Sequence, residues 1–219
     1  MSTELNRELK ELQMTLLEMA TLVEEALRSA MEALVERNTE PALAVIDGDA
    51  RIDELEIRID EESLRLLALR QPLAVDLRFI TSIIRINADI ERVGDLAVNI
   101  AERAVELNER PPLPFQVEIE ALGNVALTML QDAINSFISK DTRLAREVCK
   151  RDDEADALAT EIVHKLLDQM MKDTPAIRRA VSMIIIDRAL ERVADLATNI
   201  CEATIMYAEG KSIKHHHFE

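Results

Sequence analysis

One ten-residue motif occurs twice in this chain. Residues 91–100 read ERVGDLAVNI and residues 191–200 read ERVADLATNI, so eight of the ten positions are identical. Each copy places a glutamate and an aspartate four residues apart: Glu91 with Asp95, and Glu191 with Asp195. Like charges at this spacing share one face of a helix and destabilise an isolated helix by about 0.3 kcal/mol. An unfavourable arrangement that is repeated predicts a positively charged partner for these acids.

More acids precede each motif. In the first half they are Asp49, Asp53, Glu56 and Asp60. On a helix these four fall within about 60° of one another and form one narrow stripe. In the second half Asp152 and Asp156 repeat the first two, whereas Ala159 and Val163 replace the others. The first half is therefore the richer in carboxylates.

The spacing also predicts that the acids of each half lie at the same height. In an antiparallel helix pair, residues at equal height are equidistant from the turn. Asp53 with Glu91, and Asp49 with Asp95, share a midpoint at Pro72, where a turn is expected. The corresponding acids of the second half also share a midpoint at a predicted turn. Each half is thus expected to bring four carboxylates to one height.

Carboxylates gathered in this way repel one another unless a cation neutralises them. Oxygen ligands without His or Cys suit Mg²⁺, Ca²⁺, Mn²⁺ or iron. Asn99 and Asn199, two turns after each glutamate, are candidates for an additional amide ligand or a supporting contact. The alternative is that both stripes are solvated and pair with the arginines close to them in sequence. Those arginines are Arg85, Arg92, Arg188 and Arg192.

Six long helices must position these residues. Apolar residues at intervals of three and four from Leu5 to Leu34 predict the first helix. Asn38 and Asp141 are expected to cap the second and fifth helices, and Pro175 is expected in the first turn of the sixth. The second to sixth helices are expected at about residues 39–70, 72–110, 115–139, 142–172 and 175–210.

The predicted fold is all-α, with two tandem three-helix bundles related by the internal repeat. The first bundle covers residues 1–110 and the second residues 111–210, with a proline-rich joint at 111–114 and a tail at 211–219. The low aromatic content, 2%, and the scarcity of glycine favour helices over strands.

Composition limits the classes of function. The net charge of −16 disfavours nucleic acid and anionic membrane surfaces as partners. The N-terminus lacks the apolar region of a signal peptide, and no apolar run approaches the ~20 residues of a membrane helix. These features predict a cytoplasmic protein without membrane insertion. Cys149 and Cys201 lack CxxC spacing and are expected to be free, buried thiols.

The remaining candidate features are weaker. The run His215–His217 suits a metal, but a tag remnant or a frayed basic tail is the favoured interpretation. His164 is assigned to packing or to the surface. The sequence shows no nucleophile–base pair and no glycine-rich phosphate loop, so an enzyme is not expected.

The motifs resemble those of the PhoU family of phosphate-signalling proteins. The resemblance rests on residues 71–78, QPLAVDLR, together with the two repeated motifs, and it extends over essentially the whole chain. The tail residues 207–211, YAEGK, are similar to the family's ending. Ala194 departs from Gly94 of the first copy, a change that should not affect metal binding.

The resemblance implies a regulator that keeps phosphate-starvation responses off when phosphate is plentiful. Its implied partners are the ATPase subunit of the phosphate ABC transporter, a phosphate-responsive sensor histidine kinase and a second copy of itself. It also implies bound metal ions, such as iron, zinc, manganese or magnesium. The implied ligands are Asp49, Asp53, Glu56, Glu91, Asp95, Asp152, Asp156, Glu191 and Asp195.

Two other classes of function remain open. One is a carboxylate-bridged metal oxidase in a helical bundle, which is disfavoured because the four histidines avoid the acidic stripes. The other is a structural acidic adaptor that binds no metal. Metal analysis of untagged protein separates these classes from a metal-binding regulator.

Overall fold

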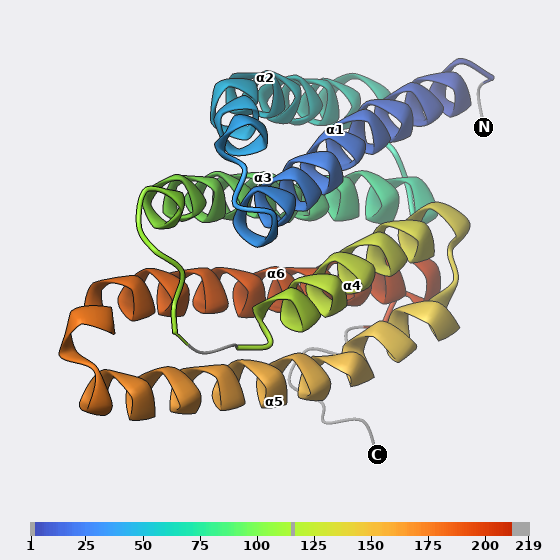
Figure 1. The fold of residues 1–219 in the computed structure, drawn as a ribbon. Helices are drawn as coiled ribbons and strands as arrows, with labels where there is room; N and C mark the ends of the chain where they lie inside the picture. Colours follow the sequence, from blue (N-terminus) through green and yellow to red (C-terminus); the bar gives the residue numbers. More distant parts are fainter. Residues whose placement is uncertain (1–2, 115–116, 212–219) are drawn as a thin grey trace.

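A computed structural model describes residues 3–114 and 117–211, and all of the regular structure in these ranges is helical. Six α-helices follow one another along the chain, and a short 3₁₀-helix, Thr174–Ala176, precedes the last of them (Figure 1). The α-helices are α1 Thr3–Val35, α2 Thr39–Arg70, α3 Val75–Asn108, α4 Ile119–Ser139, α5 Thr142–Lys172 and α6 Ile177–Glu209. The predicted all-α fold of two tandem three-helix repeats is confirmed.

Several helix ends are fixed by the residues that the sequence suggested. The side chain of Asn38 accepts a hydrogen bond from the backbone N–H of Glu40, and Asp141 accepts from two backbone N–H groups of α5. Gly210 ends α6 in the left-handed conformation, with φ of 69°, which costs a glycine little. These caps satisfy backbone groups that a helix end leaves without partners.

Three helix starts were placed too early. The sixth begins at Ile177 rather than at Pro175, which lies in the 3₁₀-helix before it. The third helix begins at Val75 rather than at Pro72, because Gln71 and Ala74 both adopt positive φ and turn the chain before the helix can begin. The fourth begins at Ile119 rather than at Phe115, which lies outside the described residues. The domain boundaries at 110 and 210 stay predictions.

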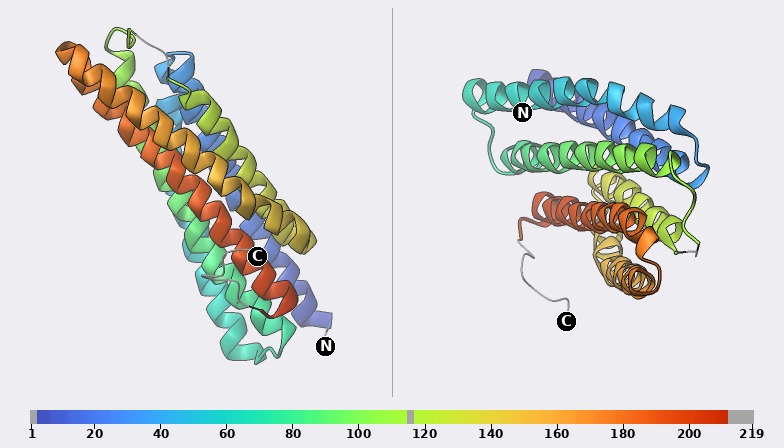
Figure 2. Two further views of the ribbon diagram at one scale, coloured as in Figure 1. Left: turned by 90° about the horizontal axis from the view of Figure 1, so that it is seen from below. Right: turned by 60° about the vertical axis from the view of Figure 1, so that its left-hand side comes forward.

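The two halves stack mainly through α3 and α6, and α1 also contacts α4. α3 and α6 lie side by side in the middle of the molecule, with α2 and α5 on the outside and α1 and α4 packed across them (Figures 1 and 2). A continuous cluster of buried Leu, Ile, Val, Ala and Met residues from both halves forms the core. In this arrangement α2 pairs with α3, and α5 pairs with α6, as two long antiparallel hairpins.

Three aromatic residues join the halves. Phe79 of α3 stacks on Phe137 of α4 with ring centroids 5.9 Å apart, and Tyr207 of α6 lies 5.1 Å from Phe79 and 5.7 Å from Phe137. All three are buried. Aromatic groups remove a large apolar area from water, so this cluster strengthens the contact between the repeats.

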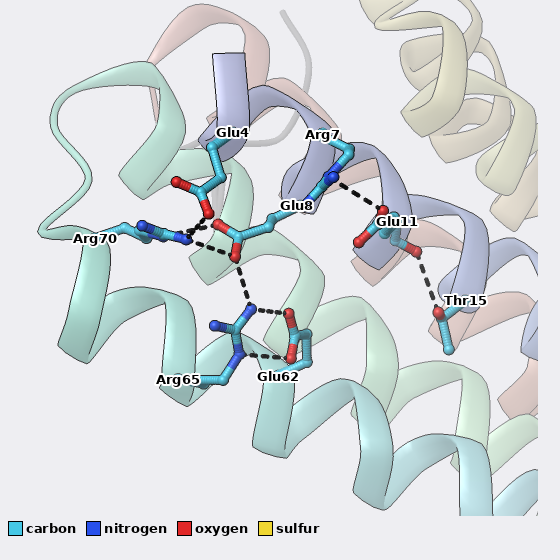
Figure 3. Close-up of polar contacts among 8 residues, drawn as sticks. All are labelled: Glu4, Arg7, Glu8, Glu11, Thr15, Glu62, Arg65 and Arg70. Carbon is cyan, nitrogen blue, oxygen red and sulfur yellow. Dashed lines mark hydrogen bonds and ion pairs between the residues drawn. The ribbon is translucent and has the colours of Figure 1, made fainter. Parts of the chain in front are cut away.

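A buried glutamate fastens α1 to α2. Glu8 accepts hydrogen bonds from Arg70, at 2.8 and 2.9 Å, and from Arg65, at 3.1 Å (Figure 3). The bond from Arg70 is the main reason that the pKa of Glu8 falls to about 2. Glu4 and Glu62 complete the network on the same two helices.

Across residues 3–114 and 117–211, no helix has an apolar stretch long enough to cross a bilayer.

Candidate metal centre

The first acidic cluster lies between α2 and α3. It consists of Asp49, Asp53, Glu56, Glu91 and Asp95. Burial, together with the nearby charges of Asp53 and Asp95, raises the pKa of Asp49. Burial raises the pKa of Glu91 as well, and Asp95, Glu56 and Asp53 add to this rise. Charges on α2 and α3 therefore act on one another, so acids of the two helices lie close together, as their spacing predicts.

The first cluster has no basic partner among the described residues. No arginine or lysine forms an ion pair with Asp49, Asp53, Glu56, Glu91 or Asp95 there. Arg92, which adjoins Glu91 in the sequence, turns to Asp89 instead, at 3.3 Å. Arg92 therefore forms no ion pair with the cluster, although its charge opposes the rise in the pKa of Glu91.

The far end of the first stripe is held by an amide. Asn87 of α3 donates to the backbone carbonyl of Glu56 at 3.0 Å and to Asp60 Oδ1 at 3.1 Å. Burial, followed by the charges of Asp60 and Asp53, raises the pKa of Glu56. Asp60 thus belongs to the hydrogen-bonded edge of the cluster, and Glu56 faces the other acids.

The second acidic cluster lies between α5 and α6. It consists of Asp152, Asp156, Glu191 and Asp195. Burial raises the pKa of Asp152 to about 6, and Asp156, Asp195, Asp153 and Glu191 contribute to this rise. Burial also raises the pKa of Asp156, with further contributions from Glu191 and Asp195. Acids of α5 and α6 therefore also lie close enough for their charges to act on one another.

Arginines neutralise part of the second cluster. Arg188 contacts Glu191, and Arg192 donates to Asp195 at 2.8 Å. Both pairs join residues three apart on α6, a spacing that brings side chains together on a helix. For these two arginines the solvated, arginine-paired interpretation is correct.

The sequence analysis missed Asp187. This α6 residue is fully buried, and neither of its carboxylate oxygens has a hydrogen-bond partner in the described chain. Burial raises its pKa to about 7. Asp187 precedes Glu191 by one helical turn, which places both on a similar face. The four-residue spacing from Glu191 could have identified Asp187 in the sequence. The first half has Asn87 at the matching position, so the internal repeat does not point to an acid there.

Two predicted site residues have oxygens without partners. Oδ1 of Asn99 and Oδ1 of Asp152 are buried and accept no hydrogen bond within the described residues. An oxygen in this state is costly unless a donor or a cation satisfies it. The donor set therefore fits a hard cation. In the described ranges, no three His, Cys, Asp or Glu side chains already stand as a ligand set.

The other candidates are less well supported. Asn199 is partly buried within the second motif, and its side chain forms no hydrogen bond among the described residues. His164 is exposed. One Glu-x-x-His spacing does occur, at Glu161 and His164, but Glu161 pairs with Lys165 at 2.8 Å. The run His215–His217 lies outside the described residues.

A family model described as "PhoU domain" matches this chain twice, over residues 16–104 and 119–204. The chain is 42% identical to the phosphate-specific transport system accessory protein PhoU homolog of Aquifex aeolicus, covering 97% of this chain and 96% of that protein. It is 39% identical to the homolog of the same name from Pseudomonas putida, covering 98% of this chain and 84% of that protein.

Two crystal structures have the same fold. PhoU from Pseudomonas aeruginosa matches with a TM-score of 0.92 at 38% identity, over 94% of this chain and 99% of that one. The phosphate transport system regulatory protein PhoU from Streptococcus pneumoniae matches with a TM-score of 0.89 at 29% identity, over 96% and 99%. The two domain matches coincide with the two halves that carry the repeated motif.

Proposed function

The chain belongs to the PhoU family, and we propose on that premise that it is a metal-binding regulator of phosphate transport and of phosphate-responsive signalling. Its relatives are named as accessory proteins of phosphate-specific transport. It acts in the cytoplasm as a homodimer, and it keeps the phosphate-starvation response off when phosphate is plentiful. Its role is regulatory rather than enzymatic, because it works through contacts with other proteins.

One observation carries the metal-binding part of this proposal. The first acidic cluster gathers five carboxylates from two helices, and none of them has an ion-pair partner in the described chain. The pKa values of Asp49, Glu56 and Glu91 are raised, first by burial and then by the neighbouring carboxylates. Charges of one sign at close range are stable only when a cation or protons neutralise them. Burial is the main cause of these raised pKa values, and for Asp49 and Glu91 charges on the opposite helix add to it.

Hard cations suit both clusters. Glu91 and Asp95 of α3 would hold the ion with Asp49, Asp53 and Glu56 of α2, and the oxygen of Asn99 supports them. In the second half, Asp152 and Asp156 would act with Glu191 and Asp195. Carboxylate and amide oxygens favour magnesium, manganese or iron, while zinc is a weaker candidate without nitrogen or sulfur ligands. The bound cation would hold each hairpin closed, and so would stabilise the surface shown to partners.

The proposed partners are the ATPase subunit of the phosphate ABC transporter and a phosphate-responsive sensor histidine kinase. Purified untagged protein is coupled to a resin through an amino group. The resin should then retain each partner, and the amount retained should change with the phosphate concentration. Failure to retain either partner at any phosphate concentration would contradict the regulatory role.

Metal content tests the second part of the proposal. Untagged wild-type protein should carry at least one equivalent of metal per chain by elemental mass spectrometry. The double variant E91A/D95A should lose most of the metal of the first half. The control E32A/E36A removes two exposed carboxylates at the same spacing in α1 and its end, and should leave the metal content unchanged. Equal metal in all three proteins would contradict the ligand assignment.

A further inference from the structure

The outer face of α2 carries a row of exposed apolar side chains. Leu43, Ile57 and Leu64 are 51%, 55% and 62% exposed, and the exposed Ala50 lies in the same row. These four residues follow one another at intervals of seven, so they lie within about 60° of one another on the helix. A single exposed leucine is normal, but a row with heptad spacing is typical of a helix that packs against another helix. We call this row of four residues the α2 ridge.

No described helix covers the α2 ridge. Within residues 3–114 and 117–211, α2 packs on α1 and α3 alone, and it lies at the outside of the molecule (Figures 1 and 2). The contacts with α1 and α3 use other residues of α2, among them the buried Ile52, Leu55 and Ile59. The α2 ridge therefore takes no part in the core and is open to a partner.

The second half lacks such a ridge. With the offset of 103 that relates Asp53 to Asp156, the matching positions on α5 are Arg146, Asp153, Thr160 and Leu167. Only the last of these is apolar, and Arg146 forms an ion pair with Glu209 at 2.9 Å. The apolar row is therefore a property of the first half and not a by-product of the internal repeat.

Acidic side chains border the α2 ridge on both sides. On one side lie exposed acids that each follow a ridge residue by four positions, about 40° away: Asp47, Glu54 and Glu61. On the other side Asp53 and Asp60 each follow a ridge residue by three positions, about 60° away. The arginines of α2 lie farther round the helix towards α1, where Arg51 pairs with Glu18 and Arg65 with Glu8. The surface is thus an apolar ridge between two acidic borders.

We propose that the α2 ridge docks a basic amphipathic helix of a partner protein. An apolar stripe on that helix covers the ridge, and lysines or arginines on its two flanks meet the acidic borders. The ridge extends from Leu43 to Leu64, about 32 Å along the helix, so the docked segment has about 20 residues.

A second copy of this chain fits the α2 ridge poorly. Two ridges packed together would set the acidic borders of one copy against those of the other, and like charges facing each other across an interface are unfavourable. The proposed homodimer therefore uses another surface. The docking inference rests on the proposed function in one respect, that the chain acts by binding other proteins, and it does not depend on a bound metal.

Binding of a synthetic helix tests the proposal. The probe is a fluorescently labelled peptide of about 20 residues, with leucine at heptad spacing and lysine on both flanks of the leucine stripe. It is titrated against the whole untagged chain by fluorescence anisotropy. The variant I57A/L64A should bind it at least about tenfold more weakly than wild type, because truncation of central apolar anchors weakens an interface most. A scrambled peptide of the same composition should also bind wild type at least about tenfold more weakly.

Two further variants serve as controls. T160A/L167A changes the matching exposed positions of α5 and should leave the affinity for the probe unchanged. E54Q/E61Q removes two charges from one acidic border and should weaken binding about fivefold, because exposed ion pairs are worth about 0.5 kcal/mol each. Far-UV circular dichroism verifies that each variant stays folded.

Several results would overturn the proposal. Equal affinity for the heptad and scrambled peptides would reduce the binding to attraction by the net charge of −16. Equal weakening in I57A/L64A and T160A/L167A would remove the preference for α2. Dissociation of a wild-type dimer in I57A/L64A, measured by analytical ultracentrifugation, would assign the ridge to a second copy. Unchanged retention of the transporter ATPase and the sensor kinase by I57A/L64A would also overturn it, and would leave the regulatory role in place.

Discussion

The two acidic clusters come from one repeated motif, yet they deal with their charge differently. In the first cluster the motif acids lack ion-pair partners in the described chain, because Arg92 is diverted to Asp89. In the second, position 189 is an alanine, and the repeated Arg192 turns to Asp195 instead. Arg188, which replaces Ala88, adds a second pair. The repeated arginine thus pairs with an acid outside the motif in the first half and with a motif acid in the second.

The buried residue one helical turn before each motif also differs between the halves in its hydrogen bonding. Asn87 donates to two oxygens of α2 in the first half, whereas Asp187 has no hydrogen-bond partner for either oxygen in the described chain. The first half therefore presents carboxylates without ion pairs, and the second presents partly paired carboxylates beside a buried carboxyl group that has no hydrogen-bond partner in the described chain. A cation should bind more tightly to the first.

The largest expected effect is on metal affinity. E91A/D95A should weaken Mn²⁺ binding at the first cluster by about 100-fold or more, since it removes two of the proposed ligands. E191A/D195A should remove only the weaker Mn²⁺ binding, which belongs to the second cluster. Calorimetric titration of metal-free protein separates the two classes. The comparison fails if the second double variant loses the tighter class.

The next effect concerns the stability of metal-free protein. D187N should raise the free energy of unfolding by about 2 kcal/mol at pH 8, because it removes an ionised, unpaired carboxylate from the interior. Asn87 shows that an amide fits the matching position. N87D should destabilise the first half by a similar amount.

The pH dependence gives a further measurement on the same variants. The folded pKa of Asp187 is about 7, above the usual value of 3.8, so folded protein binds this proton more tightly than unfolded protein. Its contribution to stability is therefore full below about pH 4 and is lost as the pH rises through 7. Urea unfolding at pH 5 and pH 8 should show this loss in wild type and a smaller one in D187N. Equal losses in both would assign the pH dependence to other groups.

A smaller effect is expected from the arginines of the second half. R188A/R192A should tighten Mn²⁺ binding at the second cluster by about fivefold, because each exposed pair is worth about 0.5 kcal/mol. The measurement is the same calorimetric titration, with R85A as the control, since Arg85 has no ion pair in the described chain. Weaker binding in the double variant would show that the arginines support the site rather than compete for it.

The smallest effect is expected from Asp89. D89N should release Arg92 towards the first cluster and weaken metal binding there by about two- to threefold. Titration of D89N beside E32A/E36A provides the comparison. Unchanged affinity in D89N would mean that Asp89 is not what keeps Arg92 away from the motif acids.

Much of this architecture was readable from spacing and caps. The helices are placed by the heptad-like apolar stripes, by the caps Asn38 and Asp141 and by the terminal Gly210. The acids that come together are equidistant in sequence from the turn between their helices. The start of α3 was misplaced because a proline was taken as a first-turn residue. The actual turn uses positive φ at Gln71 and Ala74, which spacing does not reveal.

The site was less predictable than the fold. Whether Arg92 meets Asp89 or Asp95 depends on side-chain conformations that motif spacing leaves open. The absence of a partner for Asp187 depends on the packing around it, because no donor group in the described chain reaches its carboxylate oxygens. Local periodicity carries no information on either point.

Diffraction from crystals soaked in Mn²⁺, with anomalous data collected at the manganese edge, tests the central claim most directly. The account predicts an anomalous peak between α2 and α3, within ligand distance of Glu91, Asp95 and at least one of Asp49 and Asp53. It predicts a weaker peak, or none, between α5 and α6. A fully occupied second cluster beside an empty first one, or no peak at either, would contradict the account.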